Sequence, residues 1–475
     1  MTSAYRHDDT DLTLMDWFAG AGGSSQGAHA VPGVRVERAA NHWARAIESH
    51  AANFPGTAHY QGDIRTAPVW DWPVTDLFWA SPECTNWSVA RGRRRDFSAA
   101  MQGSLLDLLA DQDDEEPTPE EESRALMEEV PLYLRGVQER GGLVKAGVVE
   151  NVVDVRAWEH WDRWLGEIHK LGYRTRVIAL NSMHANPRSV HAAPQSRDRL
   201  YVAYWHQSLG RTPDWDKWVR PRAWCGTCDQ WVQAVQWWKR VGVDMGRYRA
   251  QYVYRCPRVT CRNGVVEPEV LPAAAAIDWS LPGQRIGDRA KPLAEKTLAR
   301  ISAGLERLTA APMLVPSGGT WRTTAASVLT PMPARTTREN DALAIPPGSA
   351  GDQSLVTWNH MLLPYYGTGS ARSVAEPIGA LTTRDRYALV DRQPAIEDVH
   401  LRMLEPHEIG RAMSFTDGYT VLGTRRERVR QYGNAVTPNA SEVLLCPLVE
   451  CITGQELDRY ATPEPAAVLT GAGTA

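Results

Sequence analysis

Short apolar runs that end at a glycine, a proline or a polar cluster recur in the first half of the chain. Runs of this length are typical of buried strands, and we predict strands at residues 12–15, 77–80 and 148–149. The first run leads into the glycine-rich turn of residues 18–23, after which residues 24–30 can start a helix. A strand, a tight turn and a helix start place backbone N–H groups where a cofactor can approach closely.

The second half of the chain has a different pattern. Residues 331–343 and 377–389 repeat a Pro, Thr-Thr-Arg and Ala-Leu spacing in a region rich in Gly, Pro and Thr. Such spacing predicts short strands and loops in a small β-rich domain. We expect a final helix over residues 439–451. The acidic stretch 107–122 reads as a mobile loop, and the tail 458–475 as disordered.

Size and composition indicate a large enzyme with two or three domains. The chain has 475 residues, of which 43% are hydrophobic and 23% charged. We see no apolar stretch of membrane-spanning length, and the polar start differs from a signal peptide. We therefore expect a cytoplasmic protein with no membrane contact. The net charge of −4 neither indicates nor excludes nucleic acid, because a local basic stripe is what attracts phosphates.

Four of the seven cysteines form two close pairs. Seven cysteines in a chain of 475 residues do not make a disulfide framework. Two knuckles of this spacing can bring four thiolates together around a structural Zn²⁺ ion, the ligands being Cys225, Cys228, Cys256 and Cys261. Arginines and aromatic residues between the pairs could track a nucleic-acid backbone. A zinc ribbon that only buttresses its neighbour explains them equally well.

Cys84 stands on a proline-marked turn directly after the apolar run 77–80. A thiol there can face a cleft as a nucleophile. Taken alone, it is better explained by inert core packing, because cysteine is among the most buried residue types. The other motifs of the chain change this interpretation. The turn at 18–23, Cys84, Glu150-Asn151-Val152, Gln195 to Arg199 and Gly433 to Val436 occur in an order that resembles the motifs of the cytosine-5 DNA methyltransferases.

The resemblance implies a covalent mechanism. Cytosine C5 is a poor nucleophile, and a thiolate from Cys84 that adds to C6 would activate it. Glu150 would protonate or hydrogen-bond N3, while Arg197 and Arg199 would favour the thiolate. The base that later removes the C5 proton is not identified. Because the target is hidden in the duplex, the cytosine must be extruded.

The resemblance also implies S-adenosylmethionine as cofactor. The residues that would line its site are Asp16, Phe18, Gly20, Gly22, Gly23, Asn41, Trp43, Asp63, Ile64, Pro82, Asn434 and Val436. Two positions depart from the family pattern. Asn41 replaces an acidic residue that binds the ribose hydroxyls, and Glu83 precedes the nucleophile, where its charge should raise the thiol pKa unless its side chain points away.

We expect a two-lobed α/β protein: a Rossmann-like methyltransferase lobe, a smaller β-rich target-recognition lobe and a zinc-ribbon-like insertion. The expected segments are 11–210 (catalytic, with an acidic insertion near 100–122), 222–266 (zinc), 285–396 (recognition) and 398–455 (return to the catalytic lobe). Candidate DNA contacts are Arg91, Arg93, Arg94, Arg95, Gln195, Arg338 and Arg384.

The expected partner is double-stranded DNA, bound by a monomer, and an associated restriction endonuclease is left open. Two alternatives remain. One is methylation of tRNA cytosine, which uses similar motifs, although the long recognition region favours DNA. The other is a zinc-bearing DNA-binding protein that has lost catalysis; the intact Cys84 and Glu150 argue against it.

Overall fold

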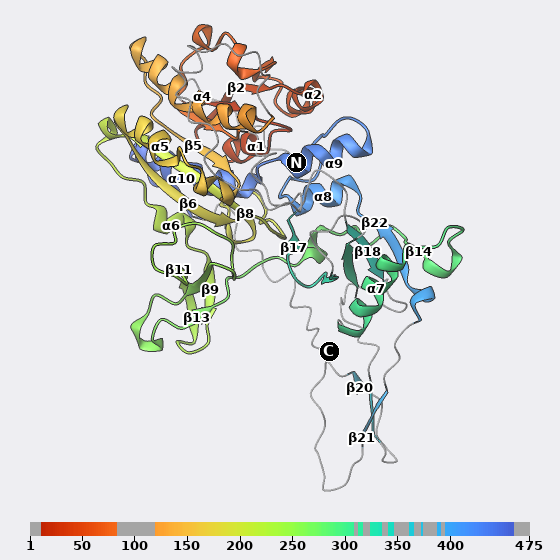
Figure 1. The fold of residues 1–475 in the computed structure, drawn as a ribbon. Helices are drawn as coiled ribbons and strands as arrows, with labels where there is room; N and C mark the ends of the chain where they lie inside the picture. The colour runs from red at the N-terminus through yellow and green to blue at the C-terminus, as the bar shows by residue number, and fades with distance from the viewer. Residues whose placement is uncertain are drawn as a thin grey trace.

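The computed structural model shows a large α/β lobe, with a small β insertion and a second β-rich lobe beside it (Figure 1). It describes residues 11–82, 119–307, 312–316, 324–334, 341–345, 361–364, 372–373, 387–390 and 395–459. Several predicted sites therefore lie outside the described residues: Cys84, Arg91, Arg93, Arg94, Arg95, Arg338 and Arg384.

A seven-stranded sheet forms the centre of the large lobe. Its order is β3 (Ala58–Gln61), β2 (Val34–Asn41), β1 (Leu12–Trp17), β4 (Leu77–Ala80), β5 (Ala146–Asn151), β8 (Asp198–His206) and β6 (Tyr173–Asn181). The first five strands are parallel, and β8 runs antiparallel to both of its neighbours. The predicted Rossmann-like lobe is thus a mixed sheet. All residues of β4 are buried, as expected for a strand covered on both faces.

Helices cover both faces of this sheet. Successive strand residues point to opposite faces, and Leu14 and Met15 accordingly belong to different cores. The core that contains Met15 is closed by α4 (Pro119–Glu139) and α5 (Trp161–Lys170). The Leu14 core is closed by α1 (Gly23–His29), α6 (Trp215–Val219) and α10 (Pro438–Thr453), while α2 (Ala44–Asn53) lies beside β2 and β3. Residues 119–122, expected within an acidic loop, instead begin α4.

The insertion consists of two small antiparallel sheets. β9 (Arg222–Cys225) pairs with β10 (Gln230–Gln233), and β11 (Val235–Trp238), β12 (Tyr252–Arg255) and β13 (Val265–Val266) form the other sheet. Tyr252, Tyr254, Cys225 and Cys256 are buried in its own small core. The insertion projects from the β6 and β8 side of the large lobe (Figure 1).

The second lobe contains the sheet β14-β22-β18-β15-β16 and the helix α7 (Glu295–Arg307). Its strands are β14 (Gln284–Arg285), β15 (Met313–Pro316), β16 (Ala326–Ser327), β18 (Asp341–Ile345) and β22 (His400–Met403). The sequence predicts a return segment from residue 398 onward. The structure corrects this, because β22 pairs with β14 and β18, so the lobe extends through Met403.

Each copy of the duplicated motif ends in a strand of a three-stranded unit, and the two units pair in the same way. In the first unit Leu314 pairs with Leu343 and Ala326. In the second, Leu362 pairs with Leu389 and Arg372, in the strands β19 (Met361–Pro364), β20 (Arg372–Ser373) and β21 (Tyr387–Val390). The predicted repeat thus corresponds to a repeated strand pairing. A further pair, β17 (Met332–Pro333) with β7 (Gln195–Ser196), joins this lobe to the large one.

The chain returns through α8 (Pro406–Ala412), α9 (Arg425–Asn434) and α10. Residues 425–453 are long and apolar enough to cross a membrane, contrary to our expectation that no stretch reaches that length, but 89% of the apolar window is buried in the protein. Such burial is typical of a core helix. Here α10 packs against α1, where Gly27 allows the approach, since a Cβ would lie 2.3 Å from the Pro438 carbonyl oxygen.

Candidate active site

The carboxyl ends of three adjacent strands, β1, β4 and β5, meet at one edge of the large sheet. The Ser81 N–H donates to the Trp17 carbonyl oxygen at 3.1 Å. The Asn151 side-chain amide donates to the Pro82 carbonyl oxygen at 3.4 Å. The segment that leads into Cys84 therefore starts between the glycine turn and Glu150.

Glu150 is the buried carboxylate at this edge. Its side chain forms an ion pair with Arg199, with 3.0 Å between Oε1 and Nε. Burial raises the pKa of Glu150 above its usual value, while the charges of Arg199 and Arg197 act in the opposite direction. The carboxyl group is thus held in a fixed orientation and can carry a proton at a higher pH than a solvated glutamate.

Arg197 connects the sheet edge to the return segment. It is buried, and its guanidinium donates to the carbonyl oxygens of Gly433 and Ala435 at 3.2 and 3.1 Å. These bonds hold the chain on both sides of Asn434, which is exposed, and just before Val436, which is buried. Arg197 therefore lies near Glu150, but these two hydrogen bonds are made to the α9–α10 junction.

Gln195 does not lie where a DNA contact would require it. Its side chain is fully buried and donates to the Ala412 carbonyl oxygen at 3.2 Å. A buried amide that closes a joint between β7 and α8 offers no donor at the surface. The polar character of Gln195 suggested a contact with DNA, but tertiary packing gives this residue a structural role.

The glycine turn after β1 is shaped for close approach. Phe18, Gly20 and Gly22 have φ angles of 60°, 56° and 96°, a region that favours glycine and strains Phe18. A Cβ at Gly22 would lie 2.5 Å from the Tyr419 hydroxyl, and one at Gly23 would lie 1.9 Å from the Val436 carbonyl oxygen. A Cβ at Gly20 would meet no described atom within 4 Å. The turn thus packs on the return segment and leaves an open cradle at Gly20.

Asp16 lies beneath this turn and is fully buried. Its Oδ2 accepts from the hydroxyls of Ser24 and Ser25 at 2.5 and 2.6 Å, while Oδ1 has no hydrogen-bond partner among the described residues. Burial raises the pKa of Asp16 to about 7. A buried carboxylate oxygen without a partner suits the cationic end of a ligand.

A network of polar groups extends from Asp16, and the sequence did not indicate this network. The His50 Nε2 lies 2.9 Å from the Ser25 hydroxyl, and its Nδ1 lies 2.8 Å from Nε2 of His59. Burial lowers the pKa of His50 to about 3, so this ring is neutral. No local pattern in the sequence could have brought these residues together, because the network joins α1, α2 and β3.

The other predicted cofactor residues lie after β2 and β3. The Asn41 side chain accepts from the Trp43 N–H at 2.9 Å and so shapes the start of α2. The guanidinium of Arg430 lies 4.6 Å from the centre of the Trp43 ring. The Asp63 carboxylate binds Arg65, whose hydrogen bond holds the pKa of Asp63 below its usual value; the adjacent Ile64 is buried.

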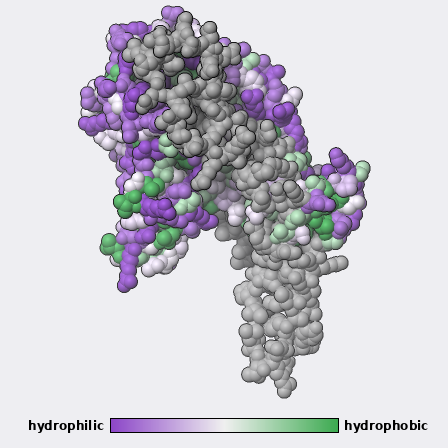
Figure 2. Space-filling model, viewed as in Figure 1, coloured by the Kyte–Doolittle hydropathy of each residue, from purple (hydrophilic) through white to green (hydrophobic). Residues whose placement is uncertain are grey.

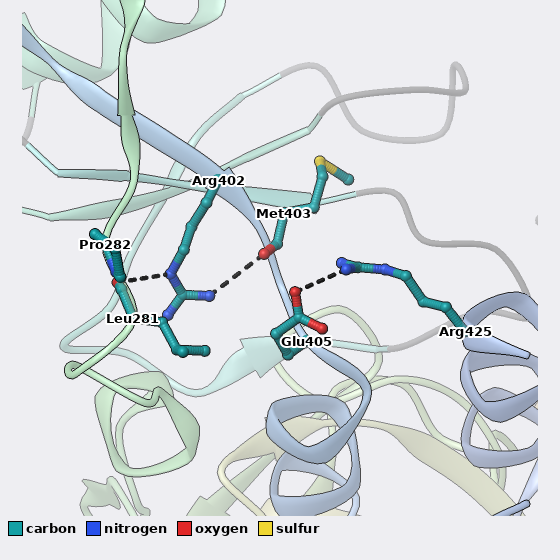
Figure 3. A pocket seen from close by; sticks show the side chains of 6 residues that line it. All are labelled: Leu281, Pro282, Arg402, Met403, Glu405 and Arg425. Carbon is teal, nitrogen blue, oxygen red and sulfur yellow. Dashed lines mark hydrogen bonds and ion pairs between the residues drawn. The ribbon is translucent and has the colours of Figure 1, made fainter.

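A separate open pocket of about 350 Å³ lies at the joint of the two lobes (Figure 3). Its polar side chains are already engaged. Arg402 donates to the carbonyl oxygens of Leu281 and Met403, and Arg425 forms an ion pair with Glu405 at 2.7 Å. The pocket contains none of the predicted cofactor or catalytic residues, and its arginines serve the joint.

The four cysteines of the insertion come together as the sequence predicts. The sulfur atoms of Cys225, Cys228, Cys256 and Cys261 all lie within 4.8 Å of one another. Four thiolates that bind one Zn²⁺ ion, each through a Zn–S bond of about 2.3 Å, must lie about as close to one another as these four sulfur atoms do. Because all four come from protein, no coordination position would remain for a substrate.

Comparison with known proteins agrees with the sequence motifs. Residues 12–110 match the model of the C-5 cytosine-specific DNA methylase family, a segment that includes both the glycine turn and Cys84. Over this segment the chain is similar to the C-5 cytosine-specific DNA methylases, a family whose members transfer a methyl group from S-adenosylmethionine to cytosine. No curated protein matches the chain.

Solved structures resemble the chain over most of its length. The Dnmt2 methyltransferase of S. pombe matches with a TM-score of 0.49 and 13% identity, over 93% of this chain and 99% of that chain. The methyltransferase EhMeth of Entamoeba histolytica gives 0.46 and 10%, over 93% and 98%. At these TM-scores and identities the likeness supports no statement about substrate.

Proposed function

We propose that this chain transfers a methyl group from S-adenosylmethionine to C5 of an extruded cytosine in DNA. The observation that carries the proposal is the meeting of the Pro82 carbonyl oxygen with Asn151, next to the buried Glu150–Arg199 pair. Cys84 follows Pro82 by two residues in the sequence, so the chain that leads to the nucleophile passes the sheet edge where the carboxyl group lies.

The thiolate of Cys84 would form a bond with C6 of the cytosine. The electron pair of the C5=C6 double bond would then form a C4=C5 double bond while that of C4=N3 moves onto N3, which takes a proton from Glu150. Negative charge is thereby neutralised and C5 becomes nucleophilic. Once C5 has taken the methyl group that the cofactor would supply, N3 would return its proton to Glu150. Loss of the C5 proton to a base would then re-form the C5=C6 double bond and expel the Cys84 thiolate.

Arg199 has a positioning role in this scheme. Its guanidinium fixes one carboxylate oxygen of Glu150 at 3.0 Å, which leaves the other oxygen to face N3. The same charge opposes the effect of burial on the Glu150 pKa. Burial has the larger effect, so the net result of these two influences is a raised pKa that favours the protonated carboxyl group.

The residues present fit S-adenosylmethionine. That cofactor supplies the methyl group and carries positive charge at its methionine end. The partnerless Oδ1 of Asp16 and the open cradle at Gly20 lie on the turn that would receive it. Tyr419 closes the turn from the return segment by donating to the Ala21 carbonyl oxygen at 2.5 Å.

The remaining features support DNA as substrate and zinc as a structural ion. The second lobe offers a repeated β unit beside the large lobe, an arrangement suited to reading a duplex on one face. Four clustered thiols favour a bound Zn²⁺ ion that stabilises the insertion.

The experiment uses the full-length protein with tritiated S-adenosylmethionine, and compares duplex DNA with tRNA. We expect label in DNA, and a covalent complex with duplexes that contain 5-fluorocytosine, since fluorine at C5 blocks the last elimination. Cys84→Ser should abolish both. Transfer to tRNA alone would contradict the DNA substrate, and transfer without a trapped complex would contradict the covalent mechanism.

A further inference from the structure

We infer that the insertion at residues 222–266 is a second nucleic-acid contact, which holds a strand beside the sheet edge that carries Glu150 through exposed tryptophans and arginines. The inference rests on the proposed function. It assigns a ligand to a surface that the methyl-transfer chemistry does not use.

Charge separates this segment from the rest of the protein. It has eight Lys and Arg against two Asp and Glu, a net charge of +6 in a chain whose total is −4. Four thiolates with one Zn²⁺ ion would reduce this to +4. Arg240, Arg258 and Arg262 are exposed and have no ion-pair partner within the part of the chain that the structure describes. A local basic surface on an acidic protein is suited to phosphates.

Exposed aromatic rings accompany these charges. Of the twelve large apolar residues exposed in the described chain, six belong to the insertion, and Figure 2 shows apolar side chains on this part of the surface. Trp224 and Trp231 are cross-strand neighbours in β9 and β10, with ring centres 5.6 Å apart. Both are nearly half exposed, although a structural role alone would favour their burial.

Arginines are stacked on two of these rings. The guanidinium of Arg222 lies 4.2 Å from the centre of the Trp231 ring, and that of Arg255 lies 4.7 Å from that of Trp237. Each stack combines a flat apolar surface with a cation. A base or sugar can pack on the ring while its phosphate meets the charge.

The insertion is fixed next to the catalytic edge. The Asp198 carboxylate accepts from the Tyr248 N–H and the Tyr252 hydroxyl at 3.1 and 3.2 Å, and Asp198 precedes the Arg199 that binds Glu150. Arg247 forms an ion pair at 2.8 Å with Asp154, which follows Asn151 closely. A strand whose cytosine enters this edge would then run onto the insertion, which carries the tryptophan and arginine surface.

The test measures binding of a fluorescein-labelled 30-base-pair duplex to the full-length protein by anisotropy over a range of salt concentrations. Trp224→Ala with Trp231→Ala should weaken binding about tenfold, as expected for the loss of stacking. Arg258→Gln with Arg262→Gln should lower the slope of log K against log salt by about two. Trp70→Ala is the matched control, because Trp70 is equally exposed and stacked with Arg140, but lies against α4.

Zinc content, measured by atomic emission, shows whether each variant keeps its insertion folded. Should the tryptophan variant lose zinc, the arginine variant decides, because its side chains are exposed. Wild-type affinity and salt slope in both variants would overturn the inference, as would a wild-type protein that does not bind the duplex. Methyl transfer by the wild type is scored separately, so a failure of the proposed function is distinguishable from a failure of this one.

Discussion

At the scale of single residues, the Glu150 pair with Arg199 defines how the site must titrate. We predict that Glu150→Gln lowers kcat by about 10²- to 10⁴-fold, because an amide can hydrogen-bond N3 but cannot protonate it. Burial raises the Glu150 pKa, so the protonated form persists to higher pH and turnover should fall as pH rises through that pKa. Single-turnover rates across pH measure this. The variant should lose that alkaline decline while still binding DNA; an unchanged rate would remove Glu150 from the mechanism.

Asp16 gives a second prediction at this scale. Its folded pKa of about 7 lies above the value of 3.8 for a solvated group. The stability that it contributes is therefore fully present below about pH 4 and is lost as pH rises toward 7. A cationic cofactor reverses the preference, because it favours the carboxylate and expels the proton on binding.

The affinity for S-adenosylmethionine should accordingly rise on the order of tenfold per pH unit below pH 7. Titration calorimetry in buffers of different ionisation enthalpy measures the released proton. Asp16→Asn should bind more weakly and show no such release. If the wild type binds without releasing a proton, Asp16 does not face the cation.

At the scale of elements, close packing between the glycine turn and the α9–α10 junction controls the shape of the proposed cofactor site. Gly23→Ala would place a Cβ 1.9 Å from the Val436 carbonyl oxygen, and overpacking of this kind costs about 1–3 kcal/mol. We predict a lower thermal midpoint and weaker cofactor binding, as measured by calorimetry. Gly166→Ala is the control: in α5 its Cβ meets nothing within 4 Å, so it should stabilise by about 1 kcal/mol. Equal midpoints for both variants would show that the turn can relax.

The same scale shows what the sequence could predict. Apolar runs located β1, β4 and β5, because hydrophobic strands with polar ends are a local signal, and α10 extends only slightly beyond the expected helix. The pairing of β22 with β14 joins residues more than a hundred positions apart and has no local signal. Burial of Gln195 and the hydrogen bond of His50 to Ser25 likewise depend on packing between distant elements. Residue types thus indicated the chemistry, whereas supporting contacts required the fold.

At the scale of the whole molecule, a buried ion pair joins the second lobe to the return helices. Arg402 of β22 makes two hydrogen bonds of 2.7 Å to Glu408 of α8, and Glu408 is fully buried. The same carboxylate accepts from the backbone N–H groups of Asp278 and Glu405 at 2.7 and 2.6 Å. Three segments thus converge on one acceptor, so the position of the second lobe depends on it.

We therefore predict that Glu408→Ala destabilises the protein by about 3–5 kcal/mol, because it leaves a buried guanidinium without its counter-charge and two backbone N–H groups without an acceptor. Calorimetry should show a lower midpoint, and limited proteolysis should cut near the joint before the large lobe unfolds. Asp288→Ala is the control: it removes the exposed Arg285 ion pair and should leave the midpoint unchanged. A single unshifted transition in Glu408→Ala would mean that β22 and α8 are held by their apolar contacts alone, and the two lobes would then keep their arrangement without this charge.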